Sequence, residues 1–253
     1  MPRVSVIIPT WNGWALLEPA LESLERQTYR DFEVIVVDNG STDGTEEHLA
    51  RRFPDVRLIR FPENRGFAPA VNAGISEGRG EFIVLMNNDT EAEPGWIGAL
   101  VRALDEHPEV GSCASRMLDF YDRSRIDAAG DRLGIMASQI GHGMPDGPEF
   151  DVPRYVLSAC AGASAYRRSA LDDVGLFDER FFAYMEDVDL GVRLQFAGYR
   201  CLYVPDAVIY HKGSATASRI AGRRFYLLMR NSLFVFFQYM PLRRLLLWGP
   251  AIL

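Results

Sequence analysis

The sequence predicts an α/β fold in which helices cover both faces of a mostly parallel sheet. In the N-terminal half, short runs rich in Val and Ile alternate with segments whose apolar residues recur at helical spacing. The runs are apolar throughout, as expected of strands buried on both faces. The chain has 253 residues, of which 48% are hydrophobic and 24% charged, a composition typical of a globular protein with a sizeable core.

The predicted elements follow one another in a regular order. Residues 4–8 form an apolar run that ends at Pro9, and residues 14–27 follow with Leu17, Leu21 and Leu24 on one helical face. A capping box at Asp43-x-x-Glu46 predicts the start of a second helix. The remaining elements of this half are strands at 34–37, 56–59 and 82–86 and a helix at 67–75.

The second half is less regular. Residues 118–153 are rich in Gly and Pro and show little periodicity, so we expect a long excursion or lid there. Regular structure resumes at 155–166, and a helix is predicted from about Glu186. We expect one domain at 1–215 in two parts, about 1–117 and about 118–215. Residues 216–253 are predicted to form a helical tail.

The charge distribution limits the possible partners and compartments. With 27 basic and 34 acidic residues the chain carries a formal net charge of −7, which excludes a uniformly basic nucleic-acid-binding protein. We therefore expect no nucleic-acid partner. The three cysteines are odd in number and widely spaced, which argues against a disulfide framework and favours a reducing compartment, so we expect a cytoplasmic protein.

Polar residues gather where the predicted parallel strands end, and ligands of such sheets bind at the carboxyl ends of the strands. Asn87-Asn88-Asp89 follows an apolar strand and offers oxygen ligands for Mg²⁺ or Mn²⁺, although Asn and Asp are also common in plain turns. The loop from Asp38 to Thr45 could hold a nucleotide or only cap a helix. Trp11 could stack on a base or only pack.

Four further residues have two interpretations each. Arg65 precedes a helix and could bind a diphosphate or lie free on the surface. Glu186 and Asp187 begin a helix, where acids favour the helix dipole, but one of them could also act as a general base in a cleft. His211 ends an apolar run and could be a metal ligand or a polar cap of a strand.

Taken together, these motifs resemble the family 2 glycosyltransferases of the GT-A fold, especially the bacterial rhamnosyltransferase-like branch. The resemblance spans about residues 3–214, and the order and spacing of its motifs are specific. Its landmarks are Pro9-Thr10-Trp11-Asn12, Val37-Asp38-Asn39-Gly40-Ser41-Thr42-Asp43-Gly44-Thr45, Asn64-Arg65-Gly66-Phe67, Asn87-Asn88-Asp89, Glu186-Asp187-Val188-Asp189 and His211-Lys212.

The resemblance implies a donor-binding half at about 1–117, an acceptor and catalytic half at about 118–215, and a role for each of these motifs. Asp187 would be the catalytic base, with Glu186 as a supporting carboxylate, and Asp89 and His211 would bind the Mg²⁺ or Mn²⁺ cofactor. Asn87 stands at the first position of the metal motif, so we expect the phosphates of the donor to complete the ligands of the cation. The nucleotide site would be formed by Pro9, Thr10, Trp11, Asn12, Asp38, Arg65, Asn87 and Asn88.

The resemblance also implies the reaction. We expect an inverting, metal-dependent glycosyltransferase that moves a sugar from a UDP- or dTDP-linked donor, such as dTDP-rhamnose, to a hydroxyl of a glycan or polyprenyl-linked acceptor. The pathway would be cell-envelope or polysaccharide synthesis. Two alternatives stay open: a catalytically silent sugar-nucleotide or glycan-binding module on the same fold, and a nucleotidyltransferase.

The tail is both aromatic and basic. Seven basic residues and no acid lie between Ala207 and Leu253, and residues 225–239 are rich in Phe and Leu. Pro241 and two arginines interrupt this apolar stretch, which argues against a membrane-spanning helix. We expect the tail either to contact the cytoplasmic face of the membrane peripherally or to pack against the domain or a second subunit as a homodimer.

Overall fold

The structure is a computed structural model that describes residues 1–133, 137–213, 221–241 and 243. Strands and helices alternate through its first half as the sequence predicts. The elements of this half are β1 (Val4–Thr10), α1 (Trp14–Glu25), β2 (Phe32–Asp38), α2 (Thr45–Arg52), β3 (Arg57–Arg60), α3 (Phe67–Glu77), β4 (Phe82–Met86), β5 (Thr90–Ala92) and α4 (Trp96–Glu106).

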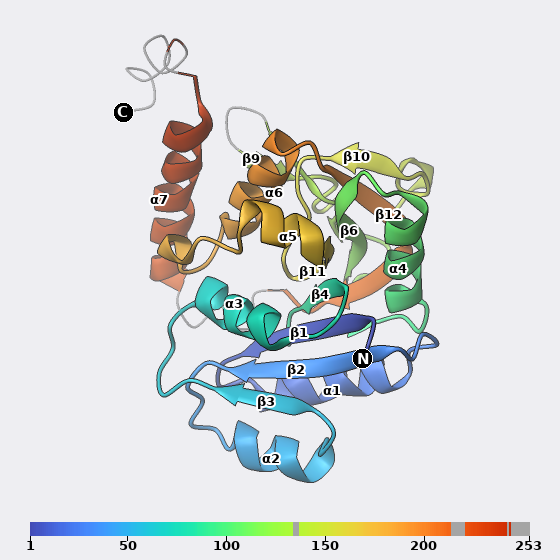
Figure 1. The fold of residues 1–253 in the computed structure, drawn as a ribbon, viewed down its shortest axis with the longest axis vertical. Coiled ribbons are helices and arrows are strands. Elements are labelled where there is room, and N and C mark those ends of the chain that lie inside the picture. The colour runs from blue at the N-terminus through green and yellow to red at the C-terminus, as the bar shows by residue number, and fades with distance from the viewer. Residues whose placement is uncertain (134–136, 214–220, 242, 244–253) are drawn as a thin grey trace.

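The second half adds strands to the same sheet. Its elements are β6 (Val110–Asp119), β7 (Ile126–Ala128), β8 (Asp131–Leu133), β9 (Ala137–Gln139), η1 (Pro148–Phe150), β10 (Arg154–Val156), β11 (Ala163–Arg167), α5 (Arg168–Val174), η2 (Glu179–Phe181), α6 (Glu186–Phe196), β12 (Arg200–His211) and α7 (Ala221–Tyr239). The predicted α/β fold is confirmed (Figure 1).

One mixed sheet connects the two halves. Its strand order is β10-β12-β6-β11-β4-β1-β2-β3, with β5 attached to β12 and β7 to β6. β1 pairs in parallel with β2 and β4, and β2 pairs in parallel with β3. β11 runs antiparallel to both of its neighbours, β4 and β6, so the direction of the strands changes near the middle of the sheet.

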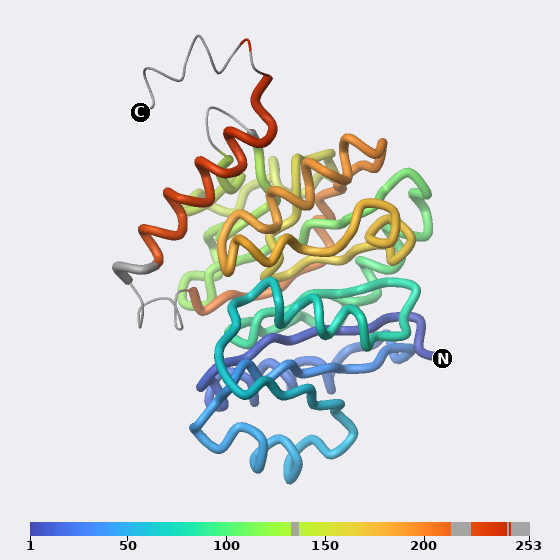
Figure 2. The backbone as a smooth tube through the Cα atoms, turned by 60° about the vertical axis from the view of Figure 1, so that its left-hand side comes forward, coloured from blue at the N-terminus to red at the C-terminus, as the bar shows by residue number. Residues whose placement is uncertain are grey.

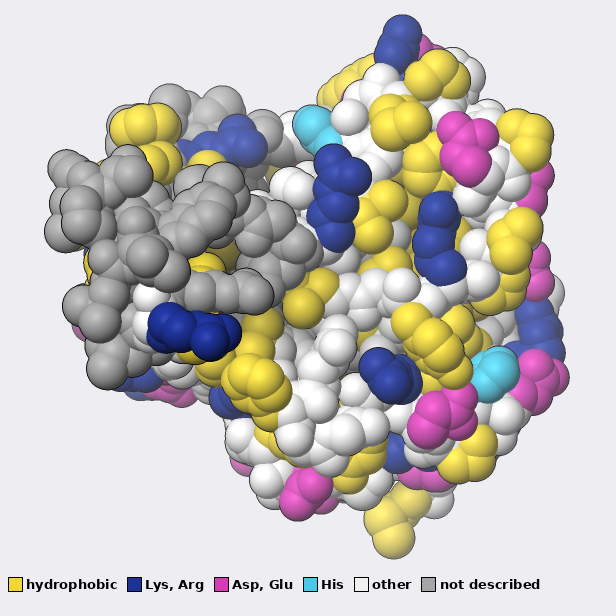
Figure 3. Space-filling view, turned by 90° about the horizontal axis from the view of Figure 1, so that it is seen from above, with side chains coloured by type: hydrophobic (Ala, Val, Ile, Leu, Met, Phe, Trp, Pro, Cys, Tyr) yellow, Lys and Arg dark blue, Asp and Glu magenta, His cyan; other side chains and the backbone are white. Residues whose placement is uncertain are grey.

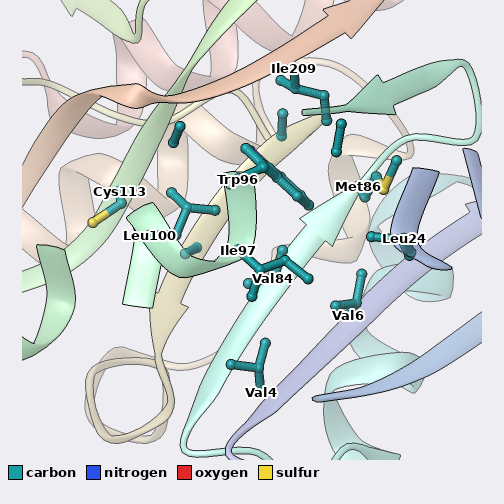
Figure 4. Packing of buried hydrophobic residues seen from close by; sticks show 14 of the residues in the cluster. Val4, Val6, Leu24, Val84, Met86, Trp96, Ile97, Leu100, Cys113 and Ile209 are labelled. Carbon is teal, nitrogen blue, oxygen red and sulfur yellow. The ribbon is translucent and has the colours of Figure 1, made fainter. Parts of the chain in front are cut away.

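Helices cover both faces because alternate residues of each buried strand point to opposite sides. Val4, Val6 and Ile8 of β1 pack with α1, α2 and α4, whereas Ile7 packs with α3, α5 and α6 on the other face. Figure 4 shows the first of these clusters, with Trp96 in the middle of it. Its indole Nε1 donates to Ser115 Oγ at 2.9 Å, which satisfies the one polar atom of this buried ring.

The predicted start of the second helix is wrong in detail. Helix α2 begins at Thr45 behind Gly44, which has a φ of 80°, and no side chain caps this end. Asp43 instead accepts hydrogen bonds from Thr45 and from the amide of Trp14 at 3.2 Å. The acid therefore joins the loops after β1 and β2 and does not form a capping box.

The glycine-rich segment at 118–153 is more ordered than the expected excursion. β7 adds to β6, and β8 pairs with β9 as a separate hairpin. Ile126 and Phe150 are buried in a small apolar cluster with Tyr203 of β12, whose hydroxyl donates to the carbonyl of Phe150 at 3.0 Å. The segment thus rests on the sheet through its own core.

Helix α7 forms a separate column at the side of the molecule, next to α6 (Figures 1 and 2). Leu227 and Val235 are buried, and Val235 packs against Phe181 and Val188. Within the described residues, no helix has the length and apolar character needed to cross a membrane. The expected domain boundary near residue 215 falls in residues 214–220, which lie outside the described part of the chain.

Candidate functional site

Polar residues of three parallel strands meet at one edge of the sheet. Thr10 of β1 lies in register with Asp38 of β2, and the triplet Asn87-Asn88-Asp89 follows β4 on the other side of β1. The amide nitrogen of Asn39 donates to the carbonyl of Thr10 at 2.8 Å. The structure therefore brings the three predicted motifs together along this edge.

Asp38 has a buried and unpaired oxygen atom. The residue is fully buried, and its Oδ1 accepts from the amide of Ser41 at 2.9 Å. Oδ2 has no hydrogen-bond partner, and the closest cation is Arg60, whose Nε lies 3.6 Å away. Because a buried carboxylate oxygen without a donor costs free energy, Oδ2 is ready to accept an N–H group of a ligand.

The loops after β1 and β2 support each other. The amide of Asn12 donates to Ser41 Oγ at 2.8 Å, and Asn12 Oδ1 accepts from the amide of Thr42 at 2.7 Å. Asn12 has a φ of 48°, in the left-handed region that Asn tolerates better than most residues. Its side chain is engaged in this loop, while Pro9 and Trp11 are partly exposed beside it.

Asn39 is a structural residue that the sequence reasoning did not single out. Its buried Nδ2 donates to the carbonyl of Gly66 at 2.8 Å and to Asn64 Oδ1 at 3.1 Å, while its Oδ1 accepts from the amide of Arg65 at 2.9 Å. Asn39 thereby fastens the loop at 64–66. The guanidinium of Arg65 lies over the Phe61 ring, 4.8 Å from its centroid, so its place beside a diphosphate stays a prediction.

Two residues of the triplet are held by their neighbours. Asn88 Nδ2 donates to Thr10 Oγ1 at 2.8 Å, and a Cβ atom on Gly13 would come within 2.4 Å of that nitrogen, so glycine is needed there. The amide of Asn87 donates to the carbonyl of Gly162 at 2.8 Å. Both asparagines shape the floor of the site, and direct contact of either one with a nucleotide stays a prediction.

Asp89 and His211 lie next to each other, as expected of two metal ligands. Asp89 Oδ1 is 3.4 Å from His211 Nε2, and the amide of Lys212 donates to the carbonyl of Asp89. Burial lowers the pKa of His211, but hydrogen bonds to Asp127 and Asp89 outweigh burial and raise the pKa to about 10. Asp127, 2.8 Å from His211 Nδ1, was missed because it lies within the irregular segment.

This pair fits a divalent cation that is also held by a ligand. Adjacent ligands ~2.1 Å from an octahedral ion lie about 3 Å apart, close to the observed 3.4 Å, and carboxylate with imidazole suits Mn²⁺. Over residues 1–133, 137–213, 221–241 and 243, no group of three or more His, Cys, Asp or Glu side chains is arranged to hold a metal. Phosphate oxygens of a ligand would have to supply the missing positions.

Glu186 and Asp187 begin α6 after an unusual turn. Phe182, Tyr184 and Met185 all have positive φ values, 67° to 71°, which is uncommon for residues with a Cβ. Glu186 is buried and its Oε2 has no partner, so burial, together with the Asp187 charge, raises its pKa well above the usual range. Asp187 is half-buried and accepts from the amides of Ala161 and Val188, yet burial still raises its pKa.

Asp131 is a further buried acid beside Asp187 that the sequence reasoning missed. It begins β8, and its Oδ2 accepts from Ser158 Oγ at 2.9 Å. Burial, and then the charge of Asp187, raise its pKa to about 7. Glu186, Asp187 and Asp131 thus form a group of carboxyls that are reluctant to ionise together.

Residues 160–162 connect the carboxyl group of Asp187 to the triplet that follows β4. Ala161 donates to Asp187, and the next residue, Gly162, accepts from Asn87. A Cβ atom on Gly162 would approach Asn87 Nδ2 to 2.9 Å. Burial raises the pKa of Tyr184, the guanidinium of Arg224 opposes this rise, and the carboxyl groups of Glu186 and Asp89 add to it.

Comparison with known proteins identifies the family. The model described as Glycosyl transferase family 2 matches residues 5–175. The chain belongs to glycosyl transferase family 2. An N-acetylglucosaminyl-diphospho-decaprenol L-rhamnosyltransferase of Mycobacterium tuberculosis is 35% identical to this glycosyltransferase over 239 residues, which cover 83% of this chain and 76% of the relative. The O-antigen biosynthesis protein RfbC of Myxococcus xanthus is 32% identical over 85% of this chain and 18% of its own length.

Solved structures confirm the predicted glycosyltransferase fold. The mannosyltransferase PcManGT of Pyrobaculum calidifontis, solved with GDP-Man and Mn²⁺, is 27% identical with a TM-score of 0.64, and the match covers 87% of this chain and 60% of that one. GalNAc-T7, solved with UDP, GalNAc and Mn²⁺, is 17% identical with a TM-score of 0.69 and 83% and 44% coverage, a likeness of fold alone. The family 2 glycosyltransferase therefore spans less than two thirds of either solved chain.

Proposed function

We propose that this glycosyltransferase moves a sugar from a nucleotide-diphosphate donor to a hydroxyl of a glycan or polyprenyl-linked acceptor, with inversion at the anomeric carbon. The donor is a UDP- or dTDP-sugar, and dTDP-rhamnose is the first to test because the Mycobacterium tuberculosis relative is named as a rhamnosyltransferase. That relative is also named for a decaprenol-linked compound, and another relative for O-antigen biosynthesis, which favours a role in cell-envelope or polysaccharide synthesis.

One observation carries the proposal: three groups of side chains with different chemistry lie together at the carboxyl edge of one sheet. Asp38 offers a buried oxygen without a partner, Asp89 and His211 form a pair suited to a cation, and Asp187 is an acid with a raised pKa. A nucleotide base, a diphosphate and an acceptor hydroxyl are the groups that these side chains would bind.

The nucleotide would lie across the ends of β1, β2 and β4. Asp38 would accept a hydrogen bond from the base, and Asp89 and His211 would hold Mg²⁺ or Mn²⁺ together with the phosphates. A bound divalent cation supplies positive charge that stabilises the diphosphate as it leaves. The remaining lining of the nucleotide site would come from Pro9, Thr10, Trp11, Asn12, Arg65, Asn87 and Asn88.

Asp187 would take the proton from the acceptor hydroxyl. Its raised pKa brings it closer to neutral pH, where a general base transfers protons most effectively. Burial raises the pKa of Glu186 well above its usual range, which favours a neutral carboxyl that could donate a hydrogen bond without adding a second negative charge. Because the acceptor oxygen attacks on the face opposite the leaving diphosphate, the anomeric configuration inverts.

The binding of donor and cation is the first test. Calorimetry with UDP, dTDP and GDP, with and without Mn²⁺, should show Mn²⁺-dependent binding of one nucleotide to the native protein. Asp89→Ala should abolish the Mn²⁺ dependence and retain nucleotide binding without metal. A folded native protein that binds none of the three nucleotides would overturn the proposal.

Turnover separates the enzyme from its alternatives. Incubation with dTDP-rhamnose or UDP-sugars and a polyprenyl-linked acceptor should release nucleoside diphosphate, whereas a nucleotidyltransferase would release pyrophosphate. Asp187→Ala should retain donor binding and lose this release. Donor binding without any turnover in the native protein would favour the silent sugar-nucleotide or glycan-binding module.

We also propose that the domain at 1–215 divides near residue 117 into a donor half and an acceptor half. For the tail, residues 216–253, we propose peripheral contact with the cytoplasmic face of a membrane. Phe225, Tyr226 and Phe237 of α7 are 69%, 61% and 45% exposed, and Arg224 is exposed beside them. Figure 3 shows the molecule from above, where hydrophobic, basic and acidic side chains are interspersed over the described surface. The exposed aromatic and basic side chains of α7 suit anionic lipid headgroups.

Vesicles distinguish this contact from dimerisation. The protein should co-sediment with phosphatidylglycerol vesicles and not with phosphatidylcholine vesicles, and the double variant Phe225→Ser, Phe237→Ser should weaken this binding. If light scattering instead finds a homodimer that the double variant dissociates, α7 is a subunit interface.

A further inference from the structure

Asp127 stands behind His211 on a different part of the chain. It lies in the middle of β7, 84 residues before the histidine, and both side chains are more than four-fifths buried. β7 pairs with β6, and β6 pairs in turn with β12, which ends at His211. The sheet itself therefore carries Asp127 to the imidazole, with Oδ2 only 2.8 Å from Nδ1.

The chemistry of this contact assigns the two ring nitrogens. An ionised carboxylate can only accept hydrogen bonds, so Nδ1 must carry a hydrogen and donate it to Asp127. Nε2, which faces Asp89 Oδ1 at 3.4 Å, is then the nitrogen that offers a lone pair once a cation displaces its proton. A carboxylate on the far nitrogen of a histidine fixes its tautomer and ring orientation and makes the near nitrogen a better metal ligand.

We infer that Asp127 is a positioning residue that holds His211 with Nε2 directed to the cation. The inference rests on the proposed function, because it assumes the cation between Asp89, His211 and the donor phosphates. It adds a residue for which neither the motif pattern nor the comparisons assign a role. It would also explain how a site with Asn87 in place of a first carboxylate holds a cation, because a stronger imidazole ligand offsets part of the affinity lost with that carboxylate.

The geometry favours positioning over direct ligation. Asp127 Oδ2 contacts Nδ1, on the other side of the ring from the atom that faces Asp89. The other oxygen, Oδ1, is 3.6 Å from His142 Nδ1, and the same nitrogen lies 2.9 Å from the carbonyl oxygen of Asp127. Oδ2 is thus engaged by His211, and the hydrogen bond from His142 to the backbone carbonyl anchors the segment that carries Asp127.

The test measures Mn²⁺ in the complex with nucleotide, without turnover. Mn²⁺ affinity is measured by calorimetry in the presence of saturating nucleotide, and pulsed EPR detects ¹⁴N modulation from a directly bound imidazole. Asp127→Asn, which keeps the size of the side chain, should weaken Mn²⁺ binding about 10- to 100-fold and reduce the ¹⁴N signal. Nucleotide affinity without metal should be unchanged. A variant that disturbs the structure in general would lower this affinity too.

Three comparisons make the outcome decisive. Asp122→Asn removes one acid from the same segment, where Asp122 is paired with Arg125, and should leave Mn²⁺ affinity unchanged. Asp127→Glu, which retains a carboxylate, should recover part of the affinity. If the native protein shows Mn²⁺ binding with ¹⁴N modulation and Asp127→Asn matches it, this inference is wrong. If the native protein itself shows no nucleotide-dependent Mn²⁺ binding, the cation site of the proposed function fails instead.

Discussion

The site has a nucleotide side, at the loops after β1 and β2, and a catalytic side, at the turn before α6. A buried asparagine holds each side in place, but the two do so in different ways. On the nucleotide side Asn39 fastens residues 64–66, which lie 25 to 27 positions further along the chain. On the catalytic side Asn231 of α7 is fully buried, and its Nδ2 donates to the carbonyls of Phe181, Ala183 and Tyr184, 47 to 50 positions earlier. One side is thus held within consecutive βα units, the other by a helix outside the matched family region.

This difference reflects how much backbone strain each side of the site contains. The turn before Glu186 contains three residues with positive φ, and each costs of order 1–3 kcal/mol and persists only because surrounding contacts hold it. Asn231, together with Arg230, which donates to the carbonyls of Arg180 and Phe181, provides that enforcement. The nucleotide loops need less support, because Gly40 and Gly66 adopt positive φ without a steric penalty and Asn12 tolerates it better than most residues.

The largest expected effect separates the two sides by function. Asp187→Asn should lower kcat about 10²- to 10⁴-fold, because a general base contributes that much to proton transfer. Nucleotide affinity measured by calorimetry should stay within about twofold of the native value, since the change lies on the catalytic side. A parallel loss of nucleotide affinity would contradict the division of the site into two sides.

The second prediction tests the hydrogen bonds by which Asn231 holds the catalytic side. Asn231→Ala leaves the carbonyls of Ala183 and Tyr184 without this donor, and each buried unsatisfied group costs about 1–3 kcal/mol. We expect a loss of about 2–4 kcal/mol in the free energy of unfolding, measured with urea, and a lower kcat with an almost unchanged KM for the donor. Ser232→Ala, a half-buried neighbour on the same helix, serves as the control and should change neither quantity appreciably.

The third prediction tests the hydrogen bonds by which Asn39 holds the nucleotide side. Asn39→Ala frees the loop at 64–66 and should weaken nucleotide binding about tenfold, which corresponds to about 1.4 kcal/mol, while kcat at saturation is retained. Asn72→Ala is the matched control, because Asn72 makes the same kind of amide contacts to Phe177 away from the nucleotide loops. If both variants weaken nucleotide binding equally, the effect is one of general stability.

The same comparison shows how far the sequence alone could lead. Strand β4 and the triplet behind it could be predicted because an apolar run followed by polar residues is a local pattern, and the glycosyltransferase family followed from several such patterns in order. Asp127, Asp131 and Asn231 could not be predicted in this way. Their partners lie 27 to 84 residues away, and the contacts arise only when β7, β8 and α7 pack against the sheet and α6.

The last prediction concerns pH and the catalytic side. The pKa of Asp131 is raised from 3.8 to about 7 by burial and by Asp187, so between these values the folded protein binds a proton that the unfolded chain releases. The stability contribution of Asp131 therefore falls as pH rises from about 4 to 7, by about 1 kcal/mol per pH unit within this window. Asp131→Asn, whose amide oxygen can still accept from Ser158, should remove this slope in urea unfolding at pH 5, 6 and 7. Asp187→Asn removes the neighbouring charge and should end the decline at a lower pH, because the pKa of Asp131 falls. Native and Asp131→Asn stabilities that run parallel over this range would mean that Asp131 does not retain a proton in the folded protein. A decline that ends at the same pH in Asp187→Asn would mean that the two acids do not interact.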